Sequence, residues 1–273
     1  MSLPIAIQLY SLREDASEDF FGTLKKVKEL GYDGVEFAGL FDNEPEMVRA
    51  FCEEIGLVPL SAHVPFDALI SETDAVIAEC RALGCKYVAV PYVTEENRPG
   101  AEGFFAAIDA ICEVGRACAT AGLQLLYHNH DFEFVKVNGE YGLDVIYSEI
   151  APEYLQTEID TCWVNVAGED PAKYVEKYTG RAPVVHLKDF FKKGSGGKLY
   201  ELIGLDDDSE EAGEETFGFK PVGHGQQDMP SILAACVKAG ASWVVIEQDR
   251  PDGDNEPIRE AEKSIAYLKS IVW

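Results

Sequence analysis

The stretch "TDAVIAECRALGCKYVAVPYV", Thr73 to Val93, contains one complete repeating unit of the fold. Its first half spaces apolar residues as a helix does, between Thr73, a residue type that caps helices, and Gly84, a residue type that ends them. Its second half is a short run rich in valine and tyrosine, which predicts a buried strand. The order helix, glycine, strand indicates an α/β architecture built from repeated units.

The same order recurs along the whole chain. The segment "SEDFFGTLKKVKELG" predicts a helix that begins at a Ser17 cap and ends at Gly31, and glycines precede further candidate strands at Gly56, Gly122 and Gly240. Eight candidate strands can be marked: "IAIQLY" from Ile5, "GVEFAG" from Gly34, "LVPLSAH" from Leu57, "KYVAVPYV" from Lys86, "LQLLYHNH" from Leu123, "LQTEID" from Leu155, "PVVHLKD" from Pro183 and "WVVIEQD" from Trp243. Eight strands that alternate with helices predict a closed (β/α)8 barrel, a TIM barrel, formed by residues 1–273 as a single domain.

The seventh unit departs from this rhythm. A polar, glycine-rich insertion at about residues 191–228 separates its strand from the eighth, and it is strongly acidic from Asp206 to Glu215. We expect its middle to form a mobile loop. "GSGG" at Gly194 to Gly197 lacks the strand and helix context of a phosphate-binding loop, which favours a flexible linker. Because the insertion follows a strand, it should lie on the barrel face that carries activity.

Composition and charge restrict the classes of function. Apolar residues make up 47% of the chain and charged residues 26%, which is typical of a globular protein with a sizeable core. Lys and Arg number 23 against 49 Asp and Glu, a formal net charge of -26 that repels nucleic acids and anionic membranes. We therefore expect a small-molecule partner, no nucleic acid and no membrane. A homo-oligomer remains open.

Cysteine usage and the N-terminal sequence bear on the cellular compartment. The seven cysteines form no CxxC pair, which favours reduced core thiols. The start of the chain, "MSLPIAIQLY", has no basic targeting region, and no apolar run approaches the roughly 20 residues that a membrane span needs. These features predict a cytoplasmic location.

The histidines are the most informative residues of the sequence. There are five: His63, His128, His130 and His186 each end a candidate strand, and His224 lies in the insertion. Acidic residues occupy equivalent places at Glu36, Asp160, Asp189 and Glu247. Strand residues alternate between the barrel interior and the helix layer, so these side chains converge at the barrel mouth if they form the inward set.

Each residue alone has an ordinary structural explanation, because a single histidine or carboxylate at a strand end is usually a hydrogen-bonded or ion-paired rim residue. The group is harder to explain in that way, since crowded buried carboxylates repel one another unless a cation or proton compensates them. Imidazole nitrogens and carboxylate oxygens around an open position suit Mn, Zn, Co or Fe. The constellation therefore predicts one divalent metal ion.

Seven motifs, in order along the chain, also match a known family: "VEFAG", "AHVPF", "YHNHDFEF", "EIDTCWV", "VVHLKDF", "PVGHGQQD" and "VVIEQD". Over essentially its full length the chain resembles the xylose isomerase-like TIM-barrel superfamily. Within it, the chain is similar to the sugar phosphate isomerase/epimerase group, relatives of ketose 3-epimerases, inosose isomerases and inosose dehydratases. The superfamily also includes endonuclease IV, a multi-metal DNA hydrolase, but the net charge and the few histidines disfavour that activity.

The resemblance implies a set of metal ligands. Epimerases of the superfamily hold a divalent metal with a Glu from strand five, an Asp from strand six, a His from strand seven and a Glu from strand eight. Asp160, His186 and Glu247 match the last three places. At the first place the sequence departs from the pattern, because His128 stands where the relatives carry glutamate. His128 is thus a candidate either for the metal or for the proton, and a symmetric two-glutamate epimerisation lacks one glutamate.

The leading interpretation is a metal-dependent isomerase or epimerase that removes the proton beside the carbonyl of a ketose, an inosose or a sugar phosphate. Glu247 is the candidate base, and His128 or His130 would deliver the proton. A dehydratase is the alternative, because an imidazolium opposite the base could protonate a departing hydroxyl. A third interpretation is a sugar-binding protein without turnover. The expected substrate contacts are Glu36, His63, Lys188 and His224.

Overall fold

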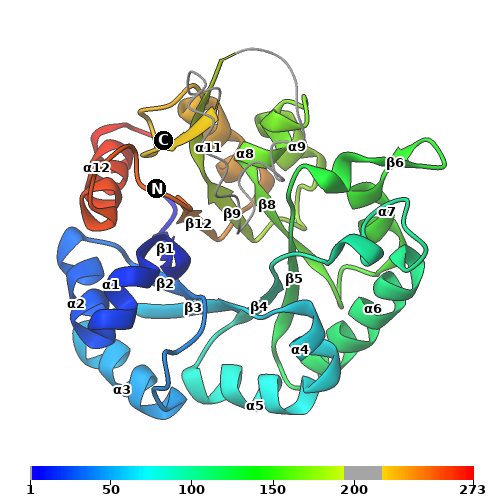
Figure 1. The fold of residues 1–273 in the computed structure, drawn as a ribbon, viewed down its shortest axis with the longest axis horizontal. Helices are drawn as coiled ribbons and strands as arrows, with labels where there is room; N and C mark the ends of the chain where they lie inside the picture. Colours follow the sequence, from blue (N-terminus) through cyan, green and yellow to red (C-terminus); the bar gives the residue numbers. More distant parts are fainter. Residues whose placement is uncertain (1, 194–216) are drawn as a thin grey trace.

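The computed structural model describes residues 2–193 and 217–273. Eight parallel strands close into a barrel, and helices surround it as a ring (Figure 1). The strands are β1 (Ile5–Gln8), β2 (Gly34–Phe37), β3 (Val58–His63), β4 (Tyr87–Val90), β5 (Gln124–His128), β8 (Gln156–Asp160), β9 (Val184–Leu187) and β12 (Trp243–Ile246). Each pairs with its neighbour in chain order, and β1 pairs with both β2 and β12, which closes the ring. The predicted TIM barrel and its eight strands are confirmed.

The helices follow the strands as the sequence indicates. They are α1 (Arg13–Glu18), α2 (Phe20–Leu30), α3 (Pro45–Ile55), α4 (Phe66–Ser71), α5 (Thr73–Leu83), α6 (Phe104–Thr120), α7 (Gly142–Glu149), α8 (Thr161–Val166), α9 (Pro171–Lys177), α11 (Met229–Ala239) and α12 (Pro257–Ser270), with 3-10 turns η1 (Leu9–Leu12), η2 (Glu95–Asn97) and η3 (Phe132–Phe134). Gly31 and Gly84 end their helices in the left-handed conformation, with φ of 97° and 86°, as predicted.

The predicted cap at Ser17 is wrong, because Ser17 lies inside the short helix α1 and α2 begins at Phe20. Helix α5 does begin at Thr73, as predicted, but Thr73 is its first helical residue and Glu72 occupies the cap position. The hydroxyl of Ser17 donates to the carbonyl of Glu14, and that of Thr73 donates to the carbonyl of Leu69. Asp19 caps α2 instead, through a bond from the Gly22 amide.

The barrel interior changes character along its axis. Toward the N-terminal ends of the strands it is filled by a compact apolar cluster: Ala6, Leu60, Tyr87, Ala89, Leu126, Val184 and Val245. On β1, β5 and β9 the side chain two residues further along points to the same side and is polar: Gln8 after Ala6, His128 after Leu126 and His186 after Val184. An apolar plug therefore supports a polar upper layer.

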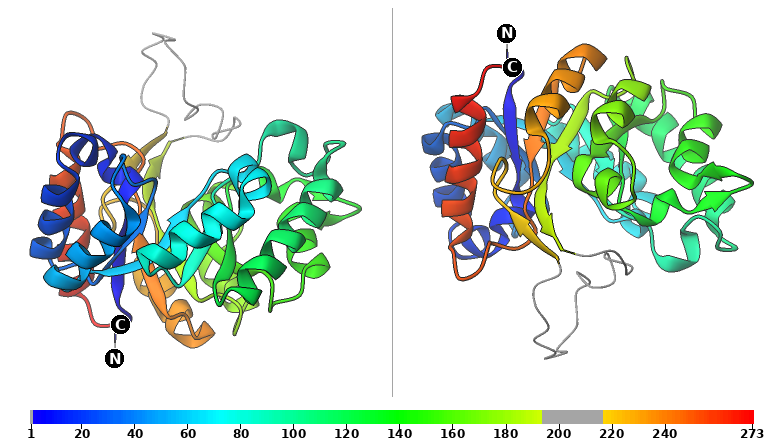
Figure 2. Two further views of the ribbon diagram at one scale, coloured as in Figure 1. Left: turned by 90° about the horizontal axis from the view of Figure 1, so that it is seen from below. Right: turned by 90° about the horizontal axis from the view of Figure 1, so that it is seen from above.

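Two antiparallel ribbons extend the barrel beyond the ends of β5 and β9. β6 (Lys136–Val137) pairs with β7 (Glu140–Tyr141), and β10 (Asp189–Lys192) pairs with β11 (Phe217–Lys220). The β10–β11 ribbon lies at the end of the barrel opposite to the two termini, which lie close together (Figure 2). The acidic run Asp206–Glu215 and the "GSGG" at Gly194–Gly197 lie outside the described residues.

None of the helices in the described ranges combines the length and the apolar composition that crossing a bilayer requires.

Candidate metal and proton-transfer site

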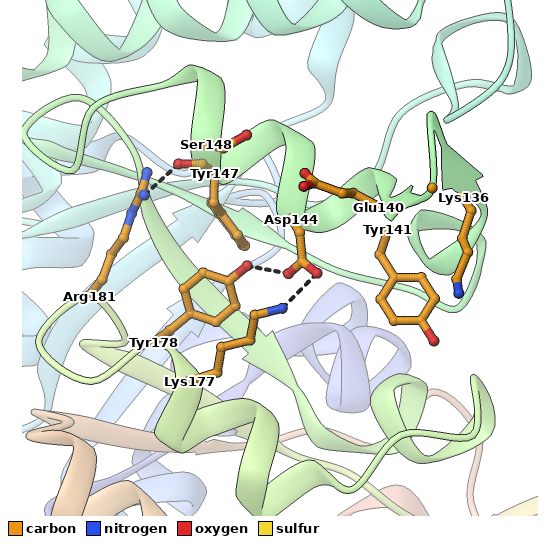
Figure 3. A pocket seen from close by; sticks show the side chains of 10 residues that line it. Lys136, Glu140, Tyr141, Asp144, Tyr147, Ser148, Lys177, Tyr178 and Arg181 are labelled. Carbon is orange, nitrogen blue, oxygen red and sulfur yellow. Dashed lines mark hydrogen bonds and ion pairs between the residues drawn. The ribbon is translucent and has the colours of Figure 1, made fainter.

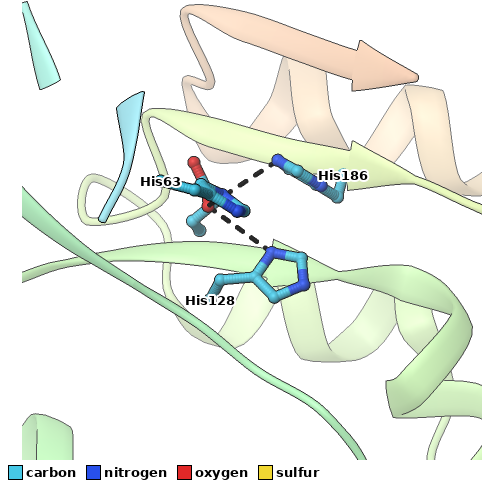
Figure 4. A group of neighbouring side chains, drawn as sticks. His63, His128 and His186 are labelled. Carbon is cyan, nitrogen blue, oxygen red and sulfur yellow. Dashed lines mark hydrogen bonds and ion pairs between the residues drawn. The ribbon is translucent and has the colours of Figure 1, made fainter. Parts of the chain in front are cut away.

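The upper layer of the barrel gathers most of the residues that the sequence singles out. Figure 4 shows the rings of His63, His128 and His186 facing one another from three strands. The ring centroids of His128 and His186 are 4.6 Å apart, and His63 stacks on His186 at 5.5 Å. His128 and His186 are buried and His63 is partly buried. Their acidic and basic partners, all buried, are Glu36, Glu158, Asp160, Lys188 and Glu247.

Four ligand groups converge on one point of this layer. One ligand atom from each of His128, Asp160, His186 and Glu247 lies within 4.8 Å of the other three. His128 Nε2 is 3.7 Å from Asp160 Oδ2, and His186 Nδ1 is 2.9 Å from Glu247 Oε2. These are the four residues predicted as ligands, and the structure brings them together.

Asp160 shows why this group suits a cation. Its Oδ1 accepts the backbone N–H groups of Cys162 and Trp163 at the start of α8, at 2.7 and 3.1 Å. Its Oδ2 is buried and has no hydrogen-bond partner among the described residues. A buried carboxylate oxygen without a donor is costly, and a metal ion would satisfy it. Two imidazoles and two carboxylates form a donor set that fits Zn, Mn, Co or Fe.

A second buried group lies beneath the first. His63 Nε2 is 2.7 Å from Glu158 Oε2 and 3.1 Å from Glu36 Oε1. Burial lowers the pKa of His63, but Glu36 and Glu158 outweigh burial and raise it to about 10. Burial raises the pKa of Glu158, but His63 and His186 outweigh it and hold that pKa well below its usual range. This group is therefore two carboxylates compensated by imidazolium.

Glu158 was not among the predicted site residues. The sequence indicated only that it shares a side of the strand with Asp160. In the closed barrel Glu158 lies directly opposite His128, because β5 and β8 pair in that register. The contact between Glu158 and His128 depends on the register of the two strands, which the sequence does not reveal.

Lys188 is almost completely buried, with a relative exposure of 1%. Its Nζ lies 3.0 Å from Asp249 Oδ1, 3.2 Å from Glu247 Oε2 and 3.6 Å from Asp160 Oδ2. Burial lowers the pKa of Lys188, but Asp249, Glu247 and Asp160 outweigh burial and raise it well above its usual value. Asp249 is a further residue that sequence reasoning missed, although it lies two residues after Glu247 and so shares its side.

His130 lies just beyond the end of β5. Its ring is 5.2 Å from that of His128 and stacks on Phe132 at 5.3 Å. Burial is the largest cause that lowers the pKa of both His128 and His130, the latter to well below its ordinary value. Both rings are therefore favoured as neutral imidazoles. Burial lowers the pKa of His186, but Glu36 and Glu158 outweigh burial and raise it well above its ordinary value, so without a metal the cations of the site are Lys188, His63 and His186. A metal ion would displace the proton from Nδ1 of His186.

The structure does not bring His224 into this group. Its side chain is exposed and its ring lies 6.4 Å from that of Tyr267 on α12. The turn that carries His224 wraps around the carboxylate of Asp189, which accepts the amides of Gly223, Gly225 and Gln227 at 2.9 to 3.1 Å. A Cβ at Gly225 would lie 2.2 Å from Asp189 Oδ1, so the second glycine of "GHG" permits this approach. The motif thus organises the turn and leaves His224 pointing outward.

Glu133 is a fully buried carboxylate beside the site. It accepts the hydroxyl of Tyr127 and the backbone amide of His130, both at 2.8 Å. Burial outweighs these bonds and raises the pKa of Glu133 from 4.5 to about 8. Glu133 therefore fixes the turn between β5 and η3 that carries His130.

We expect Glu133 to make the stability of the protein depend on pH. Between about pH 5 and about pH 8 the folded state keeps a proton that the unfolded state releases, so stability falls as the pH rises through this window. Glutamine cannot lose that proton, so the free energy of unfolding of wild type relative to Glu133→Gln should fall over the same range. Urea unfolding of both proteins at several pH values measures the difference, and parallel curves would contradict the assignment.

A cavity of about 550 Å³ lies away from this cluster, beside α7, α9 and the β6–β7 ribbon (Figure 3). Several of its polar side chains form hydrogen bonds or ion pairs with neighbouring side chains or with the backbone. Asp144 accepts the hydroxyl of Tyr178 and the ammonium of Lys177, and Arg181 donates to the carbonyl oxygens of Tyr147, Ile150 and Leu155. We interpret these contacts as packing of α7 against α9.

Comparison with known proteins agrees with this architecture. The family model described as xylose isomerase-like TIM barrel matches residues 24–271. An inosose dehydratase of Geobacillus kaustophilus is 22% identical over 91% of this chain and 86% of that protein, and one of Lacticaseibacillus casei is 22% identical over 89% and 86%.

Solved structures are similar over almost the whole chain. A sugar phosphate isomerase/epimerase of Parabacteroides distasonis superposes with a TM-score of 0.76 at 17% identity, covering 99% of this chain and 97% of that one. The IolI protein, whose crystal structure contains a zinc atom, superposes with a TM-score of 0.70 at 18% identity, covering 98% and 96%. At these identities the likeness establishes the fold.

Proposed function

This chain belongs to the xylose isomerase-like TIM barrel family, and we therefore propose that it is a divalent-metal-dependent enzyme that removes the proton beside the carbonyl of an inosose or a related ketose. The observation that carries the proposal is the convergence of His128, Asp160, His186 and Glu247 within 4.8 Å at the C-terminal end of the barrel. That end carries the active site in TIM-barrel enzymes. The family match also confirms the resemblance found in the sequence.

We assign His128 to the metal ligands. Its Nε2 faces both Asp160 Oδ2 at 3.7 Å and Glu247 Oε2 at 3.9 Å, as a fourth ligand should. A bound divalent ion supplies Lewis acidity, which stabilises the negative charge of an enediolate. The donor set supports zinc, manganese, cobalt or iron alike.

Glu247 is the proposed base. Its side chain is 8% exposed, against 3% for His128 and 0% for Asp160, so it is the most accessible carboxylate of the ligand group. Burial raises the pKa of Glu247, but Lys188 and His186 outweigh burial and hold it well below its usual range. The side chain is thus ionised at neutral pH, as a base must be, and the ammonium of Lys188 at 3.2 Å can hold a substrate oxygen beside it. His63 and His130 complete the proposed walls of the substrate site.

Loss of water is the outcome that we favour. In the two-glutamate epimerisation of the superfamily a second accessible carboxylate acts opposite the base, whereas here His128 takes its place and Glu158 is fully buried on the Nδ1 side of His128. In a dehydration Glu247 takes the α-proton, the C–H electron pair forms the enediolate, and the β-C–O bond then breaks. The departing hydroxyl takes the proton that Glu247 removed and leaves as water, while the ammonium of Lys188 stabilises the substrate oxygen beside it. The similarity to proteins named inosose dehydratase supports this outcome.

Isomerisation is the second candidate. A single base can return the proton that it removed to the neighbouring carbon, so Glu247 alone could serve a ketose isomerase. The similarity in fold to sugar phosphate isomerase/epimerases is compatible with this outcome.

The test is incubation of the metal-loaded protein with a panel of inososes, ketoses and sugar phosphates in deuterated water, followed by NMR and mass spectrometry. A dehydratase yields an unsaturated product that has lost water. An isomerase or epimerase keeps the mass of the substrate apart from any deuterium that it incorporates. Absence of turnover across the panel, with no metal-dependent change in melting temperature, would indicate a binding protein and overturn the proposal.

A further inference from the structure

We propose that Glu36 and Glu158 are positioning residues that hold the two metal-binding histidines from behind, each carboxylate orienting one imidazole. The inference rests on the metal site of the proposed function, and it replaces the expected contact of Glu36 with substrate. Both carboxylates have 0% relative exposure. They are therefore placed to act on protein groups.

The first pair is Glu36 with His186. The Nδ1 of His186 lies on the side of the metal group, 2.9 Å from Glu247 Oε2, whereas its Nε2 lies 2.8 Å from Glu36 Oε1, close enough for an ion pair but not aligned as a hydrogen bond. Glu36 is itself held on both sides. The amide of Gln8 donates to its Oε1 at 2.9 Å, and the hydroxyl of Ser61 donates to its Oε2.

Strand register fixes this arrangement. Gln8 of β1 lies opposite Glu36 of β2, and Glu36 lies opposite Ser61 of β3. The three side chains thus occupy one level of the barrel, just beneath the metal group. A carboxylate with two such donors is held in one orientation toward His186.

The second pair is Glu158 with His128. The Nε2 of His128 lies 3.7 Å from Asp160 Oδ2 and 3.9 Å from Glu247 Oε2, whereas its Nδ1 lies 3.4 Å from Glu158 Oε2, within ion-pair range but without an aligned hydrogen bond. His63 lies between the two carboxylates, with its Nε2 2.7 Å from Glu158 and 3.1 Å from Glu36. Its positive charge offsets part of their mutual repulsion.

The two pairs have the same chemical consequence. A carboxylate behind an imidazole keeps the proton on the nitrogen that faces it, which leaves the lone pair of the other nitrogen for the metal. It also raises the basicity of the imidazole as a ligand. Glu36 and Glu158 should therefore strengthen metal binding although neither touches the metal.

The deeper group could in principle hold a metal of its own, because ligand atoms of His63, His128, Glu158 and His186 also lie within 4.8 Å of one another. If ions occupied both groups at once, His128 and His186 would each bind two ions, one through each ring nitrogen, and each ring would lose both of its N–H protons. A single ion in the upper group, above Glu36 and Glu158, lets each ring keep one N–H proton. The number of ions bound per chain therefore separates the two arrangements.

The experiment measures Co²⁺ binding to the full chain without substrate, by competition with a chromophoric chelator and by the visible absorption of the bound ion. Wild type should bind one Co²⁺ per chain. Glu36→Gln and Glu158→Gln should each weaken binding by roughly 10- to 100-fold at unchanged stoichiometry, and each should shift the absorption bands. Asp144→Asn is the matched control, because it removes a carboxylate charge far from the barrel interior, and it should leave Co²⁺ affinity unchanged.

Ser61→Ala provides a milder variant in case a glutamine variant fails to fold. It loosens Glu36 without removing a charge, and it should weaken Co²⁺ binding by a smaller factor. Unchanged affinity in the folded Glu36 and Glu158 variants, or two Co²⁺ ions per wild-type chain, would overturn the inference. If wild type binds one ion but turns over no sugar, only the proposed function fails. If wild type is active and the variants keep full affinity, only this inference fails.

Discussion

Glu247→Gln is expected to reduce kcat on the substrate by roughly 10²- to 10⁴-fold. Glutamine keeps the shape of the side chain but cannot accept the α-proton, and its neutral amide is also a weaker metal ligand. Steady-state kinetics at saturating metal measures the loss, and Co²⁺ titration of the same sample shows how much of the loss comes from weaker metal binding.

Glu262→Gln is the control for this variant, because Glu262 is exposed on α12 and should tolerate the change. A proton transfer from carbon to Glu247 also predicts that the residual activity becomes at least as sensitive to deuteration of the substrate at that carbon as wild type, because cleavage of the C–H bond then limits turnover. Turnover of Glu247→Gln within about threefold of wild type, with metal bound, would exclude Glu247 as the base.

Lys188→Met is expected to lower the free energy of unfolding of the metal-free protein by about 3–5 kcal/mol, the usual cost of removing one partner from a buried ion pair. Methionine preserves most of the stem but removes the ammonium, whose nitrogen lies 5.5 Å from the ring centroid of Trp163 and 5.3 Å from that of Phe219. The carboxylates of Asp160, Glu247 and Asp249 thereby lose their common cation. Urea unfolding of the chelator-treated protein measures the loss.

Added Zn²⁺ or Mn²⁺ should restore part of this stability, because the ion would take over the compensation of Asp160 and Glu247. The increase in melting temperature on adding metal should therefore be larger for Lys188→Met than for wild type. Lys25→Met, at an exposed position of α2, is the control and should show no such difference. Equal metal responses of the three proteins would show that Lys188 and the metal do not compensate the same carboxylates.

The barrel could be predicted from the sequence because each unit carries local boundaries. Apolar runs specify the strands and glycines with positive φ end the helices, as at Gly31 and Gly84. The end of β5 was less predictable. The expected strand continues to His130, whereas it stops at His128 because the side chain of Asn129 bonds the backbone of Asp160 and turns the chain aside.

The convergence of the four candidate ligands could be predicted for a similar reason. His128 and Asp160 end their strands, His186 is the last residue but one of β9 and Glu247 directly follows β12, so alternation along the strands is enough to place them at one end of the interior. Glu158 and Asp249 could not be predicted in this way, because their place in the site depends on contacts with other segments. Glu158 lies beside His128 on the neighbouring strand, and Asp249 forms an ion pair with Lys188. The outward position of His224 depends on the hydrogen bond from the neighbouring Gly225 amide to Asp189, which is far away in the sequence at the start of β10.

The closure of the ring between β1 and β12 has a consequence for synthesis on the ribosome. The first strand is made early, but its second partner, β12, emerges only after most of the chain. Until then the edges of β1 and β9 are unpaired, and exposed edges of this kind promote aggregation. Glu247 follows directly on β12, so the nascent protein acquires its proposed base in the same event that closes its barrel. A chain cut short before β12 should therefore be both insoluble and unable to bind metal tightly.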